Sequence, residues 1–204
     1  MQDIILNDSQ KDALQELANI GAGHASTALS QMINKTVKMG IPHVELVPLS
    51  DATSYVEDEK VVAGIFLKIS DEIPSYVVVL LPRESAFAIT DMLLGTQHNP
   101  NKEVLSEMDT SALKEVGNVM ICAFFDSLSE LLNMSIVPGP PHVAFDMPSA
   151  VMDYILIQIG QISDQILFFN VDLKEEEKDN FQINMFLMPE PESINVLLEK
   201  MGMK

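Results

Sequence analysis

The sequence is poor in cysteine and in basic residues, and each shortage excludes a class of protein. Its 204 residues include one cysteine, Cys122, so an internal disulfide is impossible. Lysine and arginine total 12 against 30 aspartates and glutamates, which gives a formal net charge of -18. Such a charge repels nucleic-acid phosphates and anionic lipid surfaces over a Debye length of about 10 Å. We therefore expect no nucleic-acid partner and no membrane insertion.

The sequence also lacks the pattern of a targeting or membrane-spanning segment. The first residues, Met1 to Asp8, have neither the basic start nor the long apolar run of a secretion signal. No stretch contains 18 uninterrupted apolar residues. These absences predict a cytoplasmic protein. Hydrophobic residues nevertheless make up 47% of the chain, which is enough to bury a sizeable core.

A flexible linker is missing as well. The middle of the chain has only a polar turn, Gln97 to Lys102, which is too short to let two domains move apart. The sequence therefore predicts one domain that spans residues 1–204.

What the sequence does contain is one polar pattern in two copies, 99 residues apart. Both copies read [Asp/Ser]-x3-Glu-x2-Asn-x22-Pro. The first consists of Asp12, Glu16, Asn19 and Pro42. The second consists of Ser111, Glu115, Asn118 and Pro141. Flanking residues match at the same offset, so we predict internal repeats at approximately 9–96 and 107–203.

Each repeat is predicted to contain a long helix, three strands and a shorter helix. In the first, the helices are Ser9 to Lys38 and Glu84 to Leu94, and the strands are Val44 to Leu49, Val61 to Ile69 and Tyr76 to Leu81. In the second, a helix starts near Asp109 and ends before Pro138, strands follow at Val143 to Met147, Ile166 to Leu173 and Gln182 to Met188, and a helix covers Pro191 to Met201. Ile155 to Ile159 is a possible extra strand, and Lys174 to Lys178 is the expected insertion. The expected fold class is α/β (α+β), a pseudo-twofold domain in which both repeats share one mainly antiparallel sheet.

Helical geometry predicts that both polar patterns face outward. A helix advances 100° per residue, so residues four and three positions apart share a face. The inward stripes are expected to be Leu14, Leu17, Ala18, Gly21, Ala25, Ala28, Leu29 and Met32 in the first helix, and Leu113, Val116, Gly117, Met120, Phe124, Leu128 and Leu131 in the second. Small outward residues (Gly23, Ser26 and Ser30) are expected to leave room for a partner at the first helix face. The larger Cys122 and Phe125 are expected to reduce that room at the second face. The second site is therefore predicted to be the weaker one.

A single Glu and Asn at this spacing usually belong to a solvated helix face. Agreement at exposed positions in both copies is different, because surface residues without a function diverge after duplication. The repeated Glu and Asn therefore indicate a functional site, whereas Pro42 and Pro141 are expected to fix the entry to a strand.

The doubled pattern resembles the signature of the CheC/CheX/FliY family of chemotaxis phosphatases. Two motifs in about 200 residues, with no appended flagellar-switch domain, favour the CheC branch. The resemblance covers nearly the whole chain, including the segments Asn19-Ile-Gly-Ala-Gly23 and Glu115-Val-Gly-Asn118. It departs at Ala18, where a Gly is usual, and at Ile121-Cys122, where small residues are common. The resemblance implies dephosphorylation of the phosphorylated response regulator CheY. It also implies no cofactor of the chain's own and no bound metal, with Mg²⁺ in the regulator's pocket.

The catalytic roles that this resemblance implies agree with the chemistry of the side chains. An acyl phosphate is already activated, so the missing element is a water held in line with the phosphorus. Asn19 and Asn118 are expected to orient that water through their amides. Glu16 and Glu115 are expected to pair with the lysine that receiver domains carry beside the phosphorylation site. Asp12, Ser111 and the two prolines support the motifs.

Other functions are weighed against this one. A non-catalytic adaptor of the receptor deamidase CheD is the main alternative, with Asp146 in Phe145-Asp-Met147 as a candidate contact. A flagellar-switch phosphatase of the FliY kind is disfavoured because the chain ends at Lys204. The segment Gly21 to Ser26 lacks the glycines and lysine of a phosphate loop. The histidines, His24, His43, His98 and His142, lack metal-ligand spacing.

Overall fold

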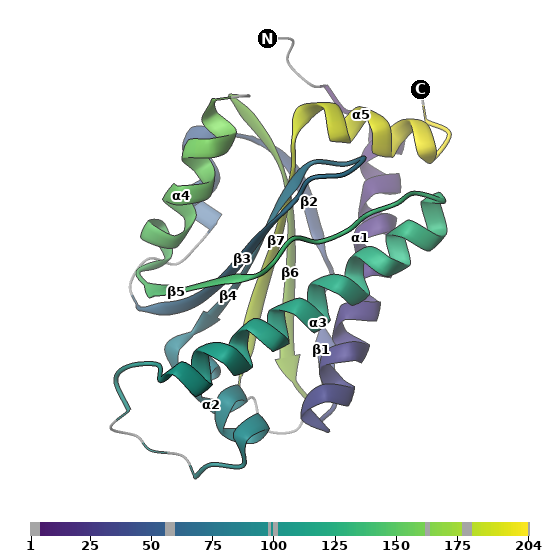
Figure 1. The fold of residues 1–204 in the computed structure, drawn as a ribbon. Coiled ribbons are helices and arrows are strands. Elements are labelled where there is room, and N and C mark those ends of the chain that lie inside the picture. Colours follow the sequence, from purple (N-terminus) through teal and green to yellow (C-terminus); the bar gives the residue numbers. More distant parts are fainter. Residues whose placement is uncertain are drawn as a thin grey trace.

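A computed structural model describes residues 5–55, 60–97, 99, 102–161, 164–176 and 181–203. His98 lies outside these ranges, as does the end of the predicted insertion at Glu177 and Lys178. Figure 1 gives the arrangement of the elements. Within the described ranges, no helix is both long enough and apolar enough to cross a membrane.

The chain contains five α-helices, one short 3-10 helix and seven strands in its described residues. The helices are α1 (Asp8–Ile33), α2 (Arg83–Leu94), α3 (Glu107–Leu132), α4 (Pro148–Gly160) and α5 (Pro191–Lys200), with a short 3-10 helix η1 (Leu49–Tyr55). The strands are β1 (Val37–Met39), β2 (His43–Pro48), β3 (Val62–Ile69), β4 (Ser75–Pro82), β5 (His142–Asp146), β6 (Gln165–Glu175) and β7 (Gln182–Pro189).

All seven strands form one sheet in the order β1-β6-β7-β4-β3-β5, with β2 also paired to β6. Every strand pairing among the described residues is antiparallel. The predicted fold class, helices with a mainly antiparallel sheet, is confirmed.

The sheet is covered on both faces, as Figure 1 shows. α1, α2, α3 and α5 supply the larger core, and α4 with η1 supplies a smaller one. Strand β4 shows how one sheet serves both, because successive side chains of a strand point to opposite faces. Val77 and Val79 belong to the larger core, and Val78 and Leu80 belong to the smaller one. A strand buried on both faces is therefore apolar throughout.

Strands of each half of the chain pair with strands of the other half. β4 pairs with β7 at its centre. β2, which follows the first motif, pairs with β6 of the other half, and β5, which follows the second motif, pairs with β3. Each motif is thus attached to a strand that is held by the opposite half.

The predicted extra strand at Ile155 to Ile159 is wrong, because these residues belong to α4. Pro148 occupies the first turn of this helix, where its missing N–H costs nothing. The sequence of this segment does not distinguish a strand from a helix, because α4 is apolar on its exposed side as well. Tyr154 and Ile157 are 59% and 63% exposed, so the helical period is masked.

The first helix is also shorter than the predicted Ser9 to Lys38. Asn34 ends α1 in the left-handed conformation with φ of 52°, which an asparagine adopts more readily than most residues. The residues beyond it form β1, which pairs with the end of β6.

Candidate functional site

The first polar pattern lies on the outer side of α1. Asp12 and Glu16 are exposed and Asn19 is half-buried. Leu14 and Leu17, which alternate with them along the helix, are 0% and 2% exposed. The predicted outward direction of this motif is therefore confirmed.

Two hydrogen bonds organise this face of α1. The Asn19 amide Nδ2 donates to Glu16 Oε2 at 3.4 Å, so the two motif side chains touch across one helical turn. Gln15 Nε2 donates to the carbonyl oxygen of Pro42, which is buried. Pro42 is therefore tied directly to α1 beside Glu16. This contact of Gln15 could not be predicted from local sequence, since its partner lies 27 residues away.

The second pattern lies on the outer side of α3. Ser111 and Glu115 are exposed and Asn118 is half-buried, as predicted. Asn118 makes a different contact from Asn19: its Oδ1 accepts a weak hydrogen bond from the Cys122 thiol, with Sγ to Oδ1 at 3.7 Å. Pro141 is half-buried and directly precedes β5.

The two helices that carry the motifs have matching ends. Both are 26 residues long, and their first and last residues are offset by 99 residues, as the motifs are. Both begin with a capping box, made by Asn7 with Gln10 and by Ser106 with Asp109. Both end on a left-handed asparagine, Asn34 and Asn133. Each motif therefore lies at the same position along a helix of the same length.

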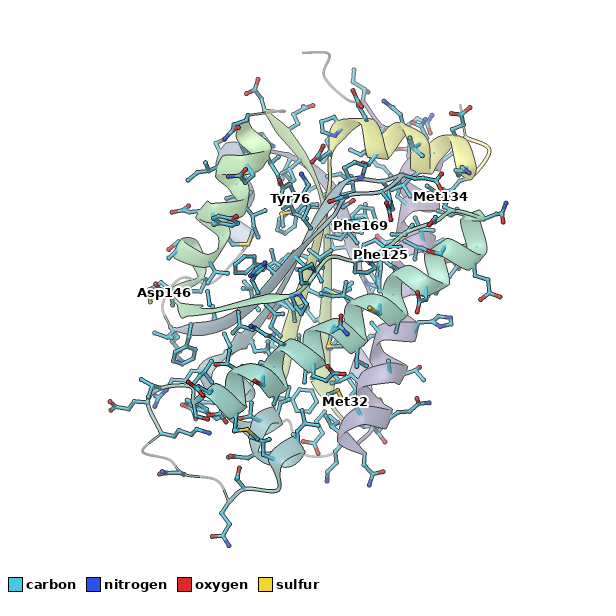
Figure 2. All side chains as sticks on the ribbon, viewed as in Figure 1. Met32, Tyr76, Phe125, Met134, Asp146 and Phe169 are labelled. Atoms are coloured by element: carbon cyan, nitrogen blue, oxygen red, sulfur yellow. The ribbon has the colours of Figure 1, made fainter. Side chains whose placement is uncertain are left out.

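Three residues that were predicted to face outward, Ser26, Ser30 and Phe125, do not do so. Ser26 is 7% exposed and donates to the carbonyl of Val37, and the half-buried Ser30 accepts a hydrogen bond from the Val37 N–H. The serines turn inward because they satisfy the backbone at the start of β1. Phe125 is 1% exposed and packs edge-on against Phe124. Figure 2 shows Phe125 in the interior, so it does not crowd the second motif.

The inward stripes are otherwise as predicted, except at Leu131 in α3 and, in part, at Ala28 and Met32 in α1. Leu131 is 54% exposed, and its neighbour Leu132 is the buried leucine of the last turn. Ala28 and Met32 are half-buried rather than buried.

Two glycines let the motif helices approach their neighbours closely. A Cβ at Gly21 would lie 2.5 Å from the Phe124 ring, where α1 packs on α3. A Cβ at Gly117 would lie 2.5 Å from Ile65 Cγ2 of β3. Both distances are far inside van der Waals contact. Each glycine is two residues or fewer from a motif asparagine, so close packing fixes the backbone that carries the amide.

Asp109 is a structural residue of the site that the sequence reading missed. Its side chain is 1% exposed and accepts hydrogen bonds from Lys102 Nζ at 2.7 Å, Ser106 Oγ at 2.6 Å and the Ser106 N–H at 2.8 Å. Burial alone raises the pKa of this carboxyl, but these donors and the Lys102 charge outweigh burial and lower the pKa to about 2. The Ser-x-x-Asp spacing before α3 was the available signal.

Replacement of Asp109 by Asn is expected to destabilise the fold by roughly 2–4 kcal/mol, because it leaves Lys102 without its buried counter-charge. The ordinary pKa is 3.8, so the wild-type carboxylate stabilises the fold above about pH 4 and loses that effect as the pH falls towards 2. Urea unfolding at pH 7 and pH 3 measures both effects. Asp126→Asn, at an exposed position of the same helix, is the control. Equal stability of the Asp109 and Asp126 variants would contradict this role.

Two hollows lie near the motif helices. One, of about 440 Å³, is lined by residues that include Asp91, Lys102 and Asp109. The other, of about 460 Å³, is lined by residues that include Lys11 and His43. Neither is lined by the repeated Glu and Asn side chains. These side chains stand on open helix faces, which suits contact with a macromolecule.

Two of the three described histidines contact other side chains, and the third is exposed. His43 lies 3.0 Å from Glu45, His142 stacks on Phe66 with ring centroids 5.6 Å apart, and His24 is exposed on α1. The described part of the chain contains no group of three or more His, Cys, Asp or Glu side chains placed to hold a metal ion. Burial, followed by the charges of Asp126 and Glu115, raises the pKa of the Cys122 thiol.

Comparison with known proteins agrees with the family resemblance of the first motif. The sequence model of the CheC-like family matches residues 10–46, which include the whole first motif. The chain is 27% identical over 203 residues to the CheY-P phosphatase CheC of Bacillus subtilis, covering 97% of this chain and 96% of that protein.

Solved structures show the same fold. FliY from Thermotoga maritima superposes with a TM-score of 0.74 at 20% identity, over 97% of this chain and 98% of that one. A Borrelia burgdorferi structure, the complex of CheX with CheY, BeF3 and Mg²⁺, matches with a TM-score of 0.59 at 16% identity, over 85% of this chain and 96% of that one.

Proposed function

We propose that the chain is a member of the CheC/CheX/FliY family and a phosphatase that accelerates dephosphorylation of phosphorylated CheY. The observation that carries this proposal is the outward Glu and Asn pair on both long helices. Because these side chains stand outside the two hollows, the phosphoryl group must be held in the partner's pocket, into which the helix face would insert.

The asparagines supply the catalytic function in this proposal. Hydrolysis forms a bond between a water oxygen and phosphorus and breaks the bond between phosphorus and the aspartyl oxygen. Both protons of the water stay with the released phosphate, as H2PO4⁻, and the aspartate side chain leaves as a carboxylate. The phosphoryl group is already activated, so holding the water in line is the main contribution that remains. The Asn19 and Asn118 amides each accept a hydrogen bond from such a water, which points its lone pair at phosphorus.

The glutamates supply docking. Glu16 and Glu115 are exposed and sit one helical turn before the asparagines. Each carboxylate would pair with the lysine beside the phosphorylated aspartate of the regulator. A charge-assisted hydrogen bond of this kind fixes the depth to which the amide enters the pocket. The metal required for the reaction, Mg²⁺, belongs in the regulator's site.

The proposal is tested by timing phosphate loss from phosphorylated CheY with and without the chain. The decay should become faster in proportion to the amount of chain added, and chelation of Mg²⁺ should stop both reactions. An unchanged decay rate at saturating chain would reject the phosphatase activity and leave the adaptor function as the alternative.

CheD is proposed as a second partner, at the junction of β5 and α4. Asp146 is exposed at the end of β5, and Figure 2 shows it at the edge of the molecule. The helix α4, which begins two residues after Asp146, exposes the apolar side chains of Tyr154 and Ile157. Aromatic and aliphatic anchors beside a charged rim are typical of protein interfaces.

Asp146→Lys is expected to weaken CheD binding by about tenfold or more, because it reverses a charge at the interface. Regulator dephosphorylation should be unchanged. Calorimetric titration with CheD measures the first effect and the decay assay measures the second. Glu130→Lys, an exposed charge reversal on α3, is the matched control. Equal CheD affinity for the two variants would remove Asp146 from the interface.

A further inference from the structure

The two motif amides are held by different groups. In the first motif, Asn19 Nδ2 donates to Glu16 Oε2, three residues towards the N-terminus. In the second, Asn118 Oδ1 accepts from the Cys122 thiol, four residues towards the C-terminus. The nitrogen and oxygen of an amide lie on opposite sides of its carbonyl carbon. Both contacts therefore set the same orientation, with nitrogen towards the preceding turn and oxygen towards the following one.

The first motif has no counterpart of the thiol. Gly23 stands at the position equivalent to Cys122, at the offset of 99 residues. Among the described residues, no heavy atom outside its own helix backbone and chain neighbours lies within 4 Å of a Cβ built at Gly23. Packing around the first motif would therefore not prevent a larger side chain at position 23. At the first motif, the Asn19 amide donates to Glu16 Oε2.

Cys122 has the properties of a hydrogen-bond donor. It is half-buried, and burial together with the nearby carboxylates of Asp126 and Glu115 raises the pKa of its thiol. The thiol therefore stays protonated at neutral pH. Its single hydrogen occupies one lone pair of Asn118 Oδ1 and leaves the second available to a water molecule.

We infer that Cys122 is a positioning residue of the second motif, whose thiol orients the Asn118 amide as Glu16 orients that of Asn19. This inference rests on the proposed function, because an oriented amide matters only if it directs a water. It follows that the two sites respond differently to substitution. The second depends on Cys122, whereas the first is independent of position 23.

Kinetics of the isolated second site test the inference. In an Asn19→Ala parent, which retains only the second motif, Cys122→Ala is expected to lower kcat for regulator dephosphorylation roughly 3- to 10-fold, the equivalent of one modest hydrogen bond. KM should be unchanged, because Glu115 still docks the regulator. Cys122→Ser, which keeps a donor, should restore most of kcat. In an Asn118→Ala parent, Cys122→Ala should have no effect.

A second readout does not depend on activity. The side-chain amide resonances of Asn118, assigned by their absence in Asn118→Ala, should shift in Cys122→Ala and remain close to wild type in Cys122→Ser. Those of Asn19 should stay in place in both variants. Thermal unfolding of each variant confirms that the fold is retained.

The outcomes separate this inference from the proposed function. Unchanged kcat in the Asn19→Ala parent, or unchanged Asn118 amide resonances, would overturn the role of Cys122 while the phosphatase activity stands. An equal loss in both parents would overturn it as well, since the effect would not pass through Asn118. Acceleration that persists without either asparagine would instead reject the proposed mechanism.

Discussion

Replacing both motif asparagines by alanine, Asn19→Ala with Asn118→Ala, is expected to reduce acceleration of regulator dephosphorylation by at least about 100-fold. Without an amide, the attacking water is no longer held in line with phosphorus, and loss of one pre-organised polar group in an active site typically costs that much. The rate should return to that of the regulator alone. Single-turnover decay of phosphorylated CheY with excess chain measures the loss.

A matched control for this variant comes from the same two helices. Gln31 and Glu130 are exposed on α1 and α3 and are also 99 residues apart. Gln31→Ala with Glu130→Ala should leave the rate unchanged. Docking should survive in the asparagine variant, so it should still compete with the wild-type chain for the regulator. Full activity of the double asparagine variant would show that other residues direct the water.

Charge reversal of both motif glutamates, Glu16→Lys with Glu115→Lys, is expected to lower kcat/KM by at least about 30-fold. An attractive contact to the regulator's lysine becomes a repulsive one at the centre of the interface. The first site should lose kcat in addition, because Glu16 also holds the Asn19 amide. The measurement is the dependence of the decay rate on regulator concentration.

The control for this variant must match its change in net charge. Glu103→Lys with Glu130→Lys changes the charge equally at two other exposed positions. It should alter the salt dependence of association while kcat stays constant. If both pairs of reversals lowered kcat/KM equally, the glutamates would act only through the overall charge of the chain.

The outward direction of both motifs was predictable because it depends on helical period alone. Asp12, Glu16 and Asn19 recur at steps of four and three residues, opposite Leu14 and Leu17. No knowledge of the neighbouring elements was needed. The central strand β4 was equally clear, since a continuous apolar run between turns is typical of a strand buried on both faces.

The wrong predictions concern residues whose burial or secondary structure depends on neighbouring elements of the fold. Phe125 is buried because α3 is covered by both α1 and the sheet, which widens its buried arc beyond the apolar stripe. Ser26 turns inward to satisfy the backbone of a strand, β1, that was not predicted. The Ile155 to Ile159 segment has no polar alternation that would reveal a helix, since Ile157 on its outer side is apolar too.

The predicted inequality of the two sites loses part of its basis. Phe125 does not line the second face, and Ser26 does not line the first. Of the residues that were predicted to make the two faces unequal in size, Gly23 and its equivalent Cys122 keep that role. The Cys122 thiol contacts Asn118 and leaves one lone pair of the Asn118 Oδ1 atom free. This difference therefore indicates two sites whose asparagines are held by different residues, and not a second site that is blocked.

In the proposed mechanism, a motif helix places its asparagine in the regulator's phosphorylation pocket. It is tested most directly by a structure of this chain bound to CheY that carries BeF3 and Mg²⁺ in place of the phosphoryl group. We expect Asn19 or Asn118 within about 3 Å of a water opposite the aspartyl oxygen, and the preceding glutamate paired with the regulator's lysine. A complex in which both asparagines remain in solvent, with the regulator bound elsewhere, would contradict the proposed mechanism.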